Sequence, residues 1–303
     1  MPQTVLDWLV RRFPAAKRQN LKRMTQAGRV RINGRPAKTL RQILADSDDV
    51  TLTDKAPKTP PPAPAGLRII YEDDDLLVAD KPAGLLTSTG PREKRETLWA
   101  MVRQYLHSRE PAARPGLIHR LDRDASGILV FSKGDLAYQS LKTQFFKHAV
   151  EREYTALVHG TPEPREGRIE THLVERTDGS VHSTRQIGKG QLAITRYETI
   201  ESAGKRSLLR VFLETGRKHQ IRVQLSERQT PIVGDSVYGR EDDAARLMLA
   251  ATRLTIQHPR DGKRMAFKVP APAEFRPLRL EKAPGETVKS RTSDTDGDPK
   301  TLA

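Results

Sequence analysis

Apolar and polar residues in the first 54 positions follow helical spacing and then an alternating pattern. An amphipathic helix is predicted from apolar residues that recur every three or four positions: Val5, Leu6, Leu9, Val10 and Phe13. A second helix is expected over residues 17–27, with Gly28 ending it. Residues 29–32 alternate like a strand, Asn33-Gly34 favours a hairpin turn, and residues 50–52 indicate another short strand. This pattern predicts a small α/β domain.

Two stretches without apolar periodicity bound a larger region. Residues 55–66, KAPKTPPPAPAG, predict an extended proline-rich linker and therefore a domain boundary. Residues 282–303 are rich in Gly, Pro, Ser, Thr and Asp, so we expect a disordered tail. The large domain is accordingly assigned to residues 67–281.

Strands and helices mix in the large domain without a strict βαβ order. Extended patterns cover residues 67–71, 76–80, 127–132, 154–158 and 208–213. Helices are expected after the capping residue Thr97, along Leu136, Leu141 and Phe145, and around Ile221. We therefore predict an α+β fold whose mixed, largely antiparallel central sheet has flanking helices.

Charge narrows the class of partner. The 303 residues carry a formal net charge of +15, and residues 1–58 alone contain 13 Lys/Arg against 5 Asp/Glu. Such an excess favours a polyanion, nucleic acid before an anionic membrane. The chain has no cysteine, no run of 18 apolar residues and no apolar leader in its first 30 residues. We expect a cytoplasmic protein that does not enter a membrane.

Residues 115–131, PGLIHRLDRDASGILVF, hold the strongest chemical signal. Asp122 lies between Arg120 and Arg123, just before an apolar strand. An isolated surface aspartate would form a weak ion pair, whereas strand ends are common places for functional sites. Asp122 and Asp124 could suggest a metal site, but the arginines oppose cation binding, so we expect no metal. Because the chain lacks a phosphate-binding glycine loop, we also expect no nucleotide cofactor.

Four motifs in order resemble the RluA-type pseudouridine synthases. They are Asp80-Lys81-Pro82-Ala83-Gly84-Leu85; His119-Arg120-Leu121-Asp122 with Ser126-Gly127; Arg152-Glu153-Tyr154-Thr155-Ala156-Leu157-Val158 with Gly160; and Thr215-Gly216-Arg217, His219-Gln220-Ile221-Arg222, Pro231-Ile232, Gly234-Asp235 and Tyr238-Gly239. The resemblance spans roughly residues 67–270 and implies a pseudouridine synthase fold.

The resemblance also implies a reaction and its residues. The N1–C1′ bond of a uridine in RNA would break, and C5 of the turned uracil would join C1′. Asp122 would either attack C1′ or remove a proton at C2′, and the sequence leaves both routes open. Arg222 would pair with Asp122, and Tyr154 would pack on the base and assist proton removal from C5. Arg120 would fill the space left by the flipped uridine.

The remaining substrate contacts follow from the same resemblance. Ile221 and Leu225 would form apolar walls, while His119, Arg217 and His219 would contact the substrate. The chain departs from the family pattern at Ala125, where Thr is usual, and at Gln224, where His is usual. Neither position is assigned to the chemical step.

Residues 1–54 are similar to an S4-like RNA-binding domain. The cationic residues expected to contact RNA are Lys17, Arg18, Lys22, Arg23, Arg29 and Arg31. Ribosomal RNA is the preferred partner and transfer RNA the next, with the enzyme acting as a monomer.

Two other classes of function compete with this interpretation. A non-catalytic RNA-binding or ribosome-assembly protein on the same fold would not need the carboxylate of Asp122 together with Tyr154 and Arg222. A carboxylate-based hydrolase of glycosides or phosphates would need a second acidic partner or a metal site.

Overall fold

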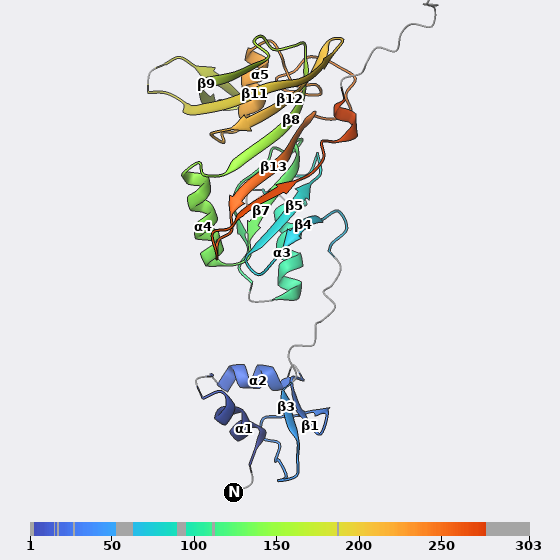
Figure 1. Cartoon of the computed structure of the whole chain (residues 1–303), viewed down its shortest axis with the longest axis vertical. Coiled ribbons are helices and arrows are strands. Elements are labelled where there is room, and N and C mark those ends of the chain that lie inside the picture. The colour runs from blue at the N-terminus through green and yellow to red at the C-terminus, as the bar shows by residue number, and fades with distance from the viewer. Residues whose placement is uncertain are drawn as a thin grey trace, which may run out of the picture. The chain divides into compact units, whose positions relative to one another are not determined.

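The computed structural model describes residues 3–276, except 15, 17, 27, 53–62, 90–94, 111–112 and 187, and except the side chain of Arg23. The chain divides into two compact units, Met1–Pro62 and Ala63–Ala303 (Figure 1). Most of the expected linker and all of the expected tail at 282–303 lie outside the described residues, so the predicted domain limits stay predictions.

The first unit packs two helices on a small sheet. Helices α1 (Val5–Arg12) and α2 (Arg18–Gln26) precede strands β1 (Val30–Ile32), β2 (Arg35–Pro36) and β3 (Val50–Leu52), in the sheet order β2-β1-β3. The side chains of Thr4 and Asp7 cap α1 by bonding each other's backbone N–H groups. Asn33 and Gly34 both have positive φ, as the turn between β1 and β2 requires. Val10, however, is 47% exposed and lies outside the expected apolar face.

The second unit is built on an 11-stranded sheet (Figure 1). Its strands are β4 (Arg68–Glu72), β5 (Leu76–Lys81), β6 (Gly116–Leu117), β7 (Ser126–Ser132), β8 (Glu151–His159), β9 (Glu166–Glu175), β10 (Val181–Thr184), β11 (Gln191–Ala203), β12 (Arg206–Leu213), β13 (Leu249–Gln257) and β14 (Arg264–Lys268). Helices α3 (Leu98–Arg109), α4 (Asp135–Phe146) and α5 (Gln220–Glu227) accompany them, with a short 3-10 helix at Ala273–Phe275.

The sheet order is β10-β9-β11-β12-β8-β13-β7-β5-β4, with β14 paired to β13 and β6 to β7. Among the strands that the structure describes, only β13 and β7 pair in parallel. The prediction of a mixed, largely antiparallel sheet with flanking helices is confirmed. None of the described helices has the length and apolar character needed to cross a membrane.

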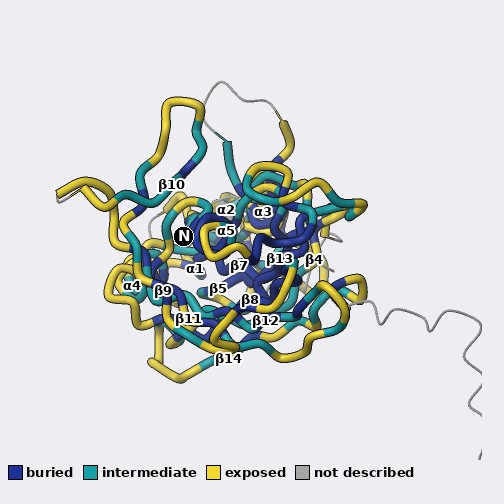
Figure 2. Tube along the Cα trace, turned by 90° about the horizontal axis from the view of Figure 1, so that it is seen from above, coloured by how far each residue is buried: buried dark blue, intermediate teal, exposed yellow. Residues whose placement is uncertain are grey.

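Strand β7 is buried along its whole length because a helix covers each face. Leu129 and Phe131 point into the same core cluster as residues of α3, whereas Ile128 and Val130 pack with Leu141 of α4. The period of two along a strand therefore divides the apolar run of β7 between two cores. Figure 2 shows β5, β7 and β13 mostly in the buried colour.

Gly127 of β7 allows the parallel pairing with β13. Its φ is +112°, and a Cβ atom there would lie 2.2 Å from the carbonyl oxygen of Ala251. Only glycine satisfies both conditions. The Ser126-Gly127 pair after the Asp122 loop therefore fixes where that loop enters the sheet.

The pattern of α4 differs from the expectation in one position. Leu141 is fully buried and Phe145 partly buried, but Leu136 is 90% exposed. Leu136 lies in the first turn of α4, where neither core cluster includes it. The helix prediction is confirmed, and the assignment of Leu136 to its apolar face is wrong.

Candidate active site

Three of the four motifs contribute residues to the wall of a cleft of about 940 Å³ in the second unit, and the first motif ends directly before Leu86, which also lines it. Its walls come from the loop 118–125 between β6 and β7, the end of α4, the start of β8 and the segment 213–222 that leads into α5. The predicted site residues that line it are His119, Arg120, Asp122, Tyr154, Arg217, His219, Ile221 and Arg222. Side chains from distant parts of the sequence thus share one cavity.

Leu225 is the exception among the predicted cleft residues. Its side chain is fully buried in the main core and is not part of the cleft wall. Ile221, one helical turn earlier, is buried and does reach the wall. The prediction that Leu225 forms a wall of the cleft is therefore wrong: Leu225 lies on the buried side of α5 and packs in the core.

Side chains of the first motif and its surroundings hold the backbone on both sides of Asp122. The Oγ1 of Thr87 accepts from the N–H of Leu121 at 3.2 Å and donates to its carbonyl at 2.8 Å. The fully buried Lys81 donates its three Nζ protons to the carbonyls of Pro82, Leu85 and Arg123, at 2.7–2.9 Å. Three backbone acceptors satisfy this ammonium, while burial lowers the pKa of Lys81 to about 8.

Asp122 forms the end of a chain of charges that starts in the core. Arg222 donates Nη1 to Oδ2 of Asp122 at 3.4 Å, and the Asp122 side chain is 25% exposed. Arg222 makes shorter bonds to Asp235, from Nε to Oδ2 at 2.8 Å and from Nη2 to Oδ1 at 2.7 Å. The guanidinium is thus fixed mainly by Asp235 and presents its remaining nitrogen to Asp122.

Electrostatics agree with this order of partners. Burial by itself would lower the pKa of Arg222, but the bonds to Asp235 outweigh it and the pKa is raised. Burial would raise the pKa of Asp235, yet Arg222 and the N–H groups of Val237 and Tyr238 lower it. Both groups therefore stay charged when buried. No role was predicted for Asp235 from the sequence, although it belongs to the Gly234-Asp235 motif.

Tyr154 lies on β8 beside these charges. Its side chain is buried, and burial raises the pKa of the phenol to about 12, so the hydroxyl keeps its proton at neutral pH. Asp122 raises this pKa further and Arg152 opposes the rise, because both charges are near the ring. The hydroxyl has no hydrogen-bond partner within the part of the chain that the structure describes. It is available to a group in the cleft.

His119 contacts the protein on two sides. Its Nε2 accepts from the N–H of Val130 at 3.1 Å, and its ring stacks on Phe145 with centroids 4.6 Å apart. Burial, helped by the charges of Arg152 and Lys142, lowers the pKa of His119 to about 3. The imidazole is therefore neutral with its proton on Nδ1, and it joins the loop to β7 and α4. His119 also lines the cleft, and its expected substrate contact stays a prediction.

His219 and Arg217 are also held by the protein. His219 has φ +54° at the start of α5, and its Nδ1 lies 2.8 Å from the hydroxyl of Tyr238. Burial lowers the pKa of His219. Arg217 donates Nε to the carbonyl of Leu192 at 3.0 Å and lines the cleft wall. Both residues remain candidates for substrate contact.

Arg217 and two further arginines of the cleft wall have no acidic partner among the described residues. Arg120 is exposed and makes no hydrogen bond or ion pair with any residue that the structure describes. Arg152 makes long contacts from Nη2 to the carbonyls of Leu213 and Glu214 at 3.3–3.4 Å, and its guanidinium carbon lies 5.8 Å from the centre of the Phe145 ring. Its buried Nε has no partner among the described residues. Burial lowers the pKa of Arg152. The sequence placed Arg152 within a motif but gave no sign that it lacks a counter-ion.

The two departures from the family pattern lie in buried surroundings. Ala125 is 2% exposed, belongs to the main core and touches the cleft. Gln224 is fully buried and donates Nε2 to Thr171 Oγ1 at 2.9 Å and to the carbonyl of Ala193 at 3.0 Å. Gln224 therefore ties α5 to β9 and β11.

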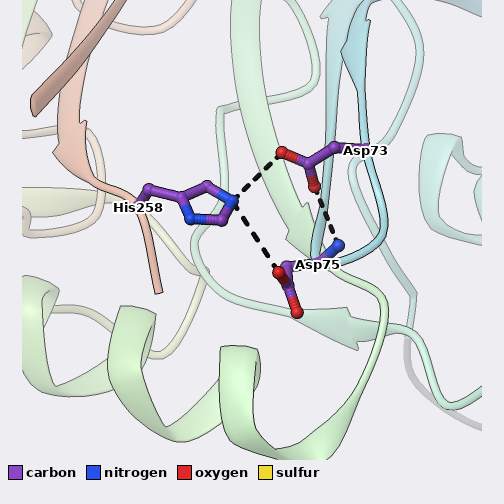
Figure 3. A group of neighbouring side chains, drawn as sticks. All are labelled: Asp73, Asp75 and His258. Carbon is purple, nitrogen blue, oxygen red and sulfur yellow. Dashed lines mark hydrogen bonds and ion pairs between the residues drawn. The ribbon is translucent and has the colours of Figure 1, made fainter. Parts of the chain in front are cut away.

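One group of described side chains could geometrically hold a metal ion, and it does not belong to the cleft wall. Asp73, Asp75 and His258 place one ligand atom each within 4.8 Å of one another (Figure 3). Both oxygens of Asp75 are already bound by Arg260, and Asp73 accepts bonds from His258 Nε2 and Tyr71. These contacts join the β4–β5 turn to the β13–β14 turn as an ionic cluster.

The predicted RNA contacts of the first unit can be placed in part. Lys17 and the side chain of Arg23 lie outside the described residues. Arg18, Lys22 and Arg31 are exposed, and Arg31 also donates to the carbonyl of Gly34 at 3.0 Å. Arg29 is half-buried.

Known proteins resemble this chain in sequence and fold. Residues 75–227 match the sequence pattern of the RNA pseudouridylate synthase family. An RNA pseudouridine synthase of Bacillus subtilis is 33% identical over 269 residues, covering 86% of this chain and 88% of the relative. The ribosomal large subunit pseudouridine synthase D of Zymomonas mobilis is 33% identical over 261 residues, covering 80% of each chain.

Solved structures agree with the fold. Human RNA pseudouridylate synthase domain containing 4 superposes with a TM-score of 0.58 at 22% identity, over 69% of this chain and 90% of that one. Human RNA pseudouridylate synthase domain containing 1 gives 0.55 at 27% identity, over 67% and 83%. The resemblance drawn from the four motifs is confirmed: this chain belongs to the RNA pseudouridylate synthase family and isomerises uridine in RNA.

Proposed function

We propose that Asp122 carries the chemical step on a flipped-out uridine of large-subunit ribosomal RNA. The observation that carries this proposal is the partly exposed Asp122 carboxylate in the cleft, 3.4 Å from a guanidinium that Asp235 fixes. Attack at C1′ and proton removal at C2′ both need an ionised carboxylate free to meet the sugar. The buried Arg222–Asp235 pair supports either route, because it orients Asp122 while its own charges compensate each other.

Tyr154 and Arg120 take the two roles that base flipping requires. The buried ring of Tyr154 packs on the extruded uracil, and its protonated hydroxyl reaches the C5 edge when the new bond has formed. Arg120 enters the RNA at the position the uridine leaves, since it is exposed and has no partner among the described residues. Arg217, His219 and Ile221 complete the contacts to the target nucleotide.

The choice of ribosomal RNA rests on the relatives and on the first unit. The Zymomonas mobilis relative is named for the large ribosomal subunit. The small basic unit presents Arg18, Lys22 and Arg31 on its surface, which suits an S4-like domain that binds the phosphates of folded RNA. On this proposal the enzyme is a cytoplasmic monomer that works where ribosomes are assembled.

Mapping pseudouridines in total RNA from a strain without this gene tests the substrate. We expect one or more pseudouridines of large-subunit ribosomal RNA to be lost and then restored by the wild-type gene. Loss confined to transfer RNA would contradict the proposed substrate but keep the reaction. An unchanged pseudouridine map would contradict the proposal itself.

Single substitutions test the first unit as the phosphate-binding surface. Arg18→Gln, Lys22→Gln and Arg31→Gln should each weaken binding to ribosomal RNA and reduce the salt slope by about 1. Arg264→Gln is the matched control, because Arg264 pairs with Glu151 outside the cleft wall. Three unchanged slopes would exclude these side chains as RNA contacts.

A further inference from the structure

Helix α4 ends with an exposed aromatic ring at the edge of the cleft. The side chain of Phe146 is 84% exposed, and it lines the same cavity as Asp122 and Tyr154. Among the large hydrophobic side chains that are exposed in the described residues, no other lines this cavity. Leu136 is 90% exposed at the opposite end of α4, but it lies outside the cleft wall.

The ring of Phe146 extends from a well-held part of the protein. Its neighbour Phe145 stacks on His119, and Leu141 of the same helix is fully buried. The N–H of Lys147 donates to the carbonyl of Thr143 at 2.9 Å and closes the last turn. A ring on such a support loses little conformational entropy when a ligand packs on it.

The surroundings of the ring select the class of ligand. Lys142 lies one helical turn before Phe146 and also lines the cleft. Its ammonium forms no ion pair with a described residue, and its contact with the carbonyl of Ile118 is 3.5 Å long. Lys147 and His148 follow and are exposed. A flat apolar face beside unpaired positive charge matches a nucleotide, whose base stacks and whose phosphate is anionic.

We propose that Phe146 and Lys142 bind an unpaired nucleotide next to the target uridine, with its base on the ring and its phosphate at the ammonium. This inference rests on the RNA substrate and adds a contact outside the reacting nucleotide. A substrate whose neighbouring nucleotide is free to unstack gains this contact, whereas a fully paired neighbour does not. The site therefore favours loops and bulges over continuous helices.

Binding of two single strands to the full-length protein tests the stacking directly. The probes are a short oligouridylate and an abasic strand of equal length, which keeps the phosphates and lacks the bases. Phe146→Ala should weaken binding of the oligouridylate about tenfold and leave the abasic strand unaffected. Phe146→Trp should retain the affinity for the oligouridylate. The oligouridylate should also quench the fluorescence of this variant more than that of the wild type, whose signal comes from Trp8 and Trp99.

Leu136→Ala is the matched control, since it removes an equally exposed apolar side chain from the same helix. It should change neither affinity. Equal binding of oligouridylate by Phe146→Ala and wild type would overturn the proposal, as would an equal loss for both strands. The proposal would also be overturned if Phe146→Ala changed the oligomeric state and bound the oligouridylate as the wild type does, because the ring would then serve a protein contact. These assays need no turnover, so their outcome is separate from the assignment of Asp122.

Discussion

Among the described residues, charged side chains have partners in the buried floor beneath the cleft, but several arginines lack acidic ones at its solvent-facing rim. On the floor, Lys81 donates to three carbonyls and Arg222 is held by two bonds to Asp235. On the rim, Arg120 and Arg152 have no acidic partner among the described residues, and Phe146 exposes its ring. The floor is therefore complete in the free protein and serves to position Asp122, whereas these two rim arginines have a counter-charge only when an anionic ligand supplies one.

Removing the partner of Arg222 should produce the largest effect. Asp235→Ala leaves a buried guanidinium without its main counter-charge, which costs about 3–5 kcal/mol of unfolding free energy. Urea unfolding of the variant measures this loss. The matched control is Asp243→Ala, because Asp243 pairs with Arg206 while 90% exposed, and it should cost less than about 1 kcal/mol. Similar costs for the two variants would contradict the role of Asp235 as the buried counter-charge that holds Arg222 in the floor.

Neutralising Arg152 should affect RNA binding and spare the fold. Arg152→Gln should weaken binding to ribosomal RNA about tenfold and reduce the salt slope by about 1, because one phosphate contact is lost. Urea unfolding should show no loss of stability, since the variant removes a half-buried charge that has no counter-ion among the described residues. Arg264→Gln serves as control for binding. A destabilised protein with unchanged RNA affinity would show that Arg152 supports the fold, like the floor residues, and does not contact RNA.

The neutral imidazole of His119 predicts a smaller effect that depends on pH. Its pKa is about 3 in the folded protein and 6.5 for a freely solvated imidazole, so below pH 6.5 the unfolded chain binds the extra proton. Stability should therefore fall as pH drops from 6.5 towards 3. His119→Gln keeps an acceptor for the N–H of Val130 and cannot titrate, so it should lose less stability between pH 7 and pH 5.

Unfolding of the second unit can be followed separately for this comparison. Trp99 reports on that unit when Trp8 of the first unit is replaced by Phe in both proteins. The difference between wild type and His119→Gln should shrink as pH falls. Parallel curves at all pH values would mean that His119 is not buried in its neutral form.

The sequence predicted the parts of the fold whose signal is local. A continuous apolar run identified β7, and Thr97 marked the start of α3. Strands β9 and β11 were not predicted, because few positions on their inward-facing sides carry a large apolar side chain: on β9, Gly167 and Thr171 flank Ile169 on that side. These strands depend on pairing with distant neighbours, which a single segment does not encode.

The candidate site could be predicted as far as its motifs reach. Asp122, Tyr154 and Arg222 were each identified from a motif, and the structure brings them to one cleft. The bond of Arg222 to Asp235 was missed, because the rest of α5 and a turn separate the two residues in sequence. The missing counter-ion of Arg152 has no sequence signal, since it depends on which side chains surround the folded guanidinium.

Tritium release from RNA labelled at uridine C5 tests the assignment of Asp122 most directly. Formation of the C5–C1′ bond expels the C5 hydrogen, so each turnover releases one label. Asp122→Asn keeps the size of the side chain and a hydrogen-bond acceptor for Arg222, and it removes the carboxylate. We predict that its release falls to background while its affinity for the RNA stays close to wild type. Release at the wild-type rate would contradict the assignment of Asp122 as the reactive group.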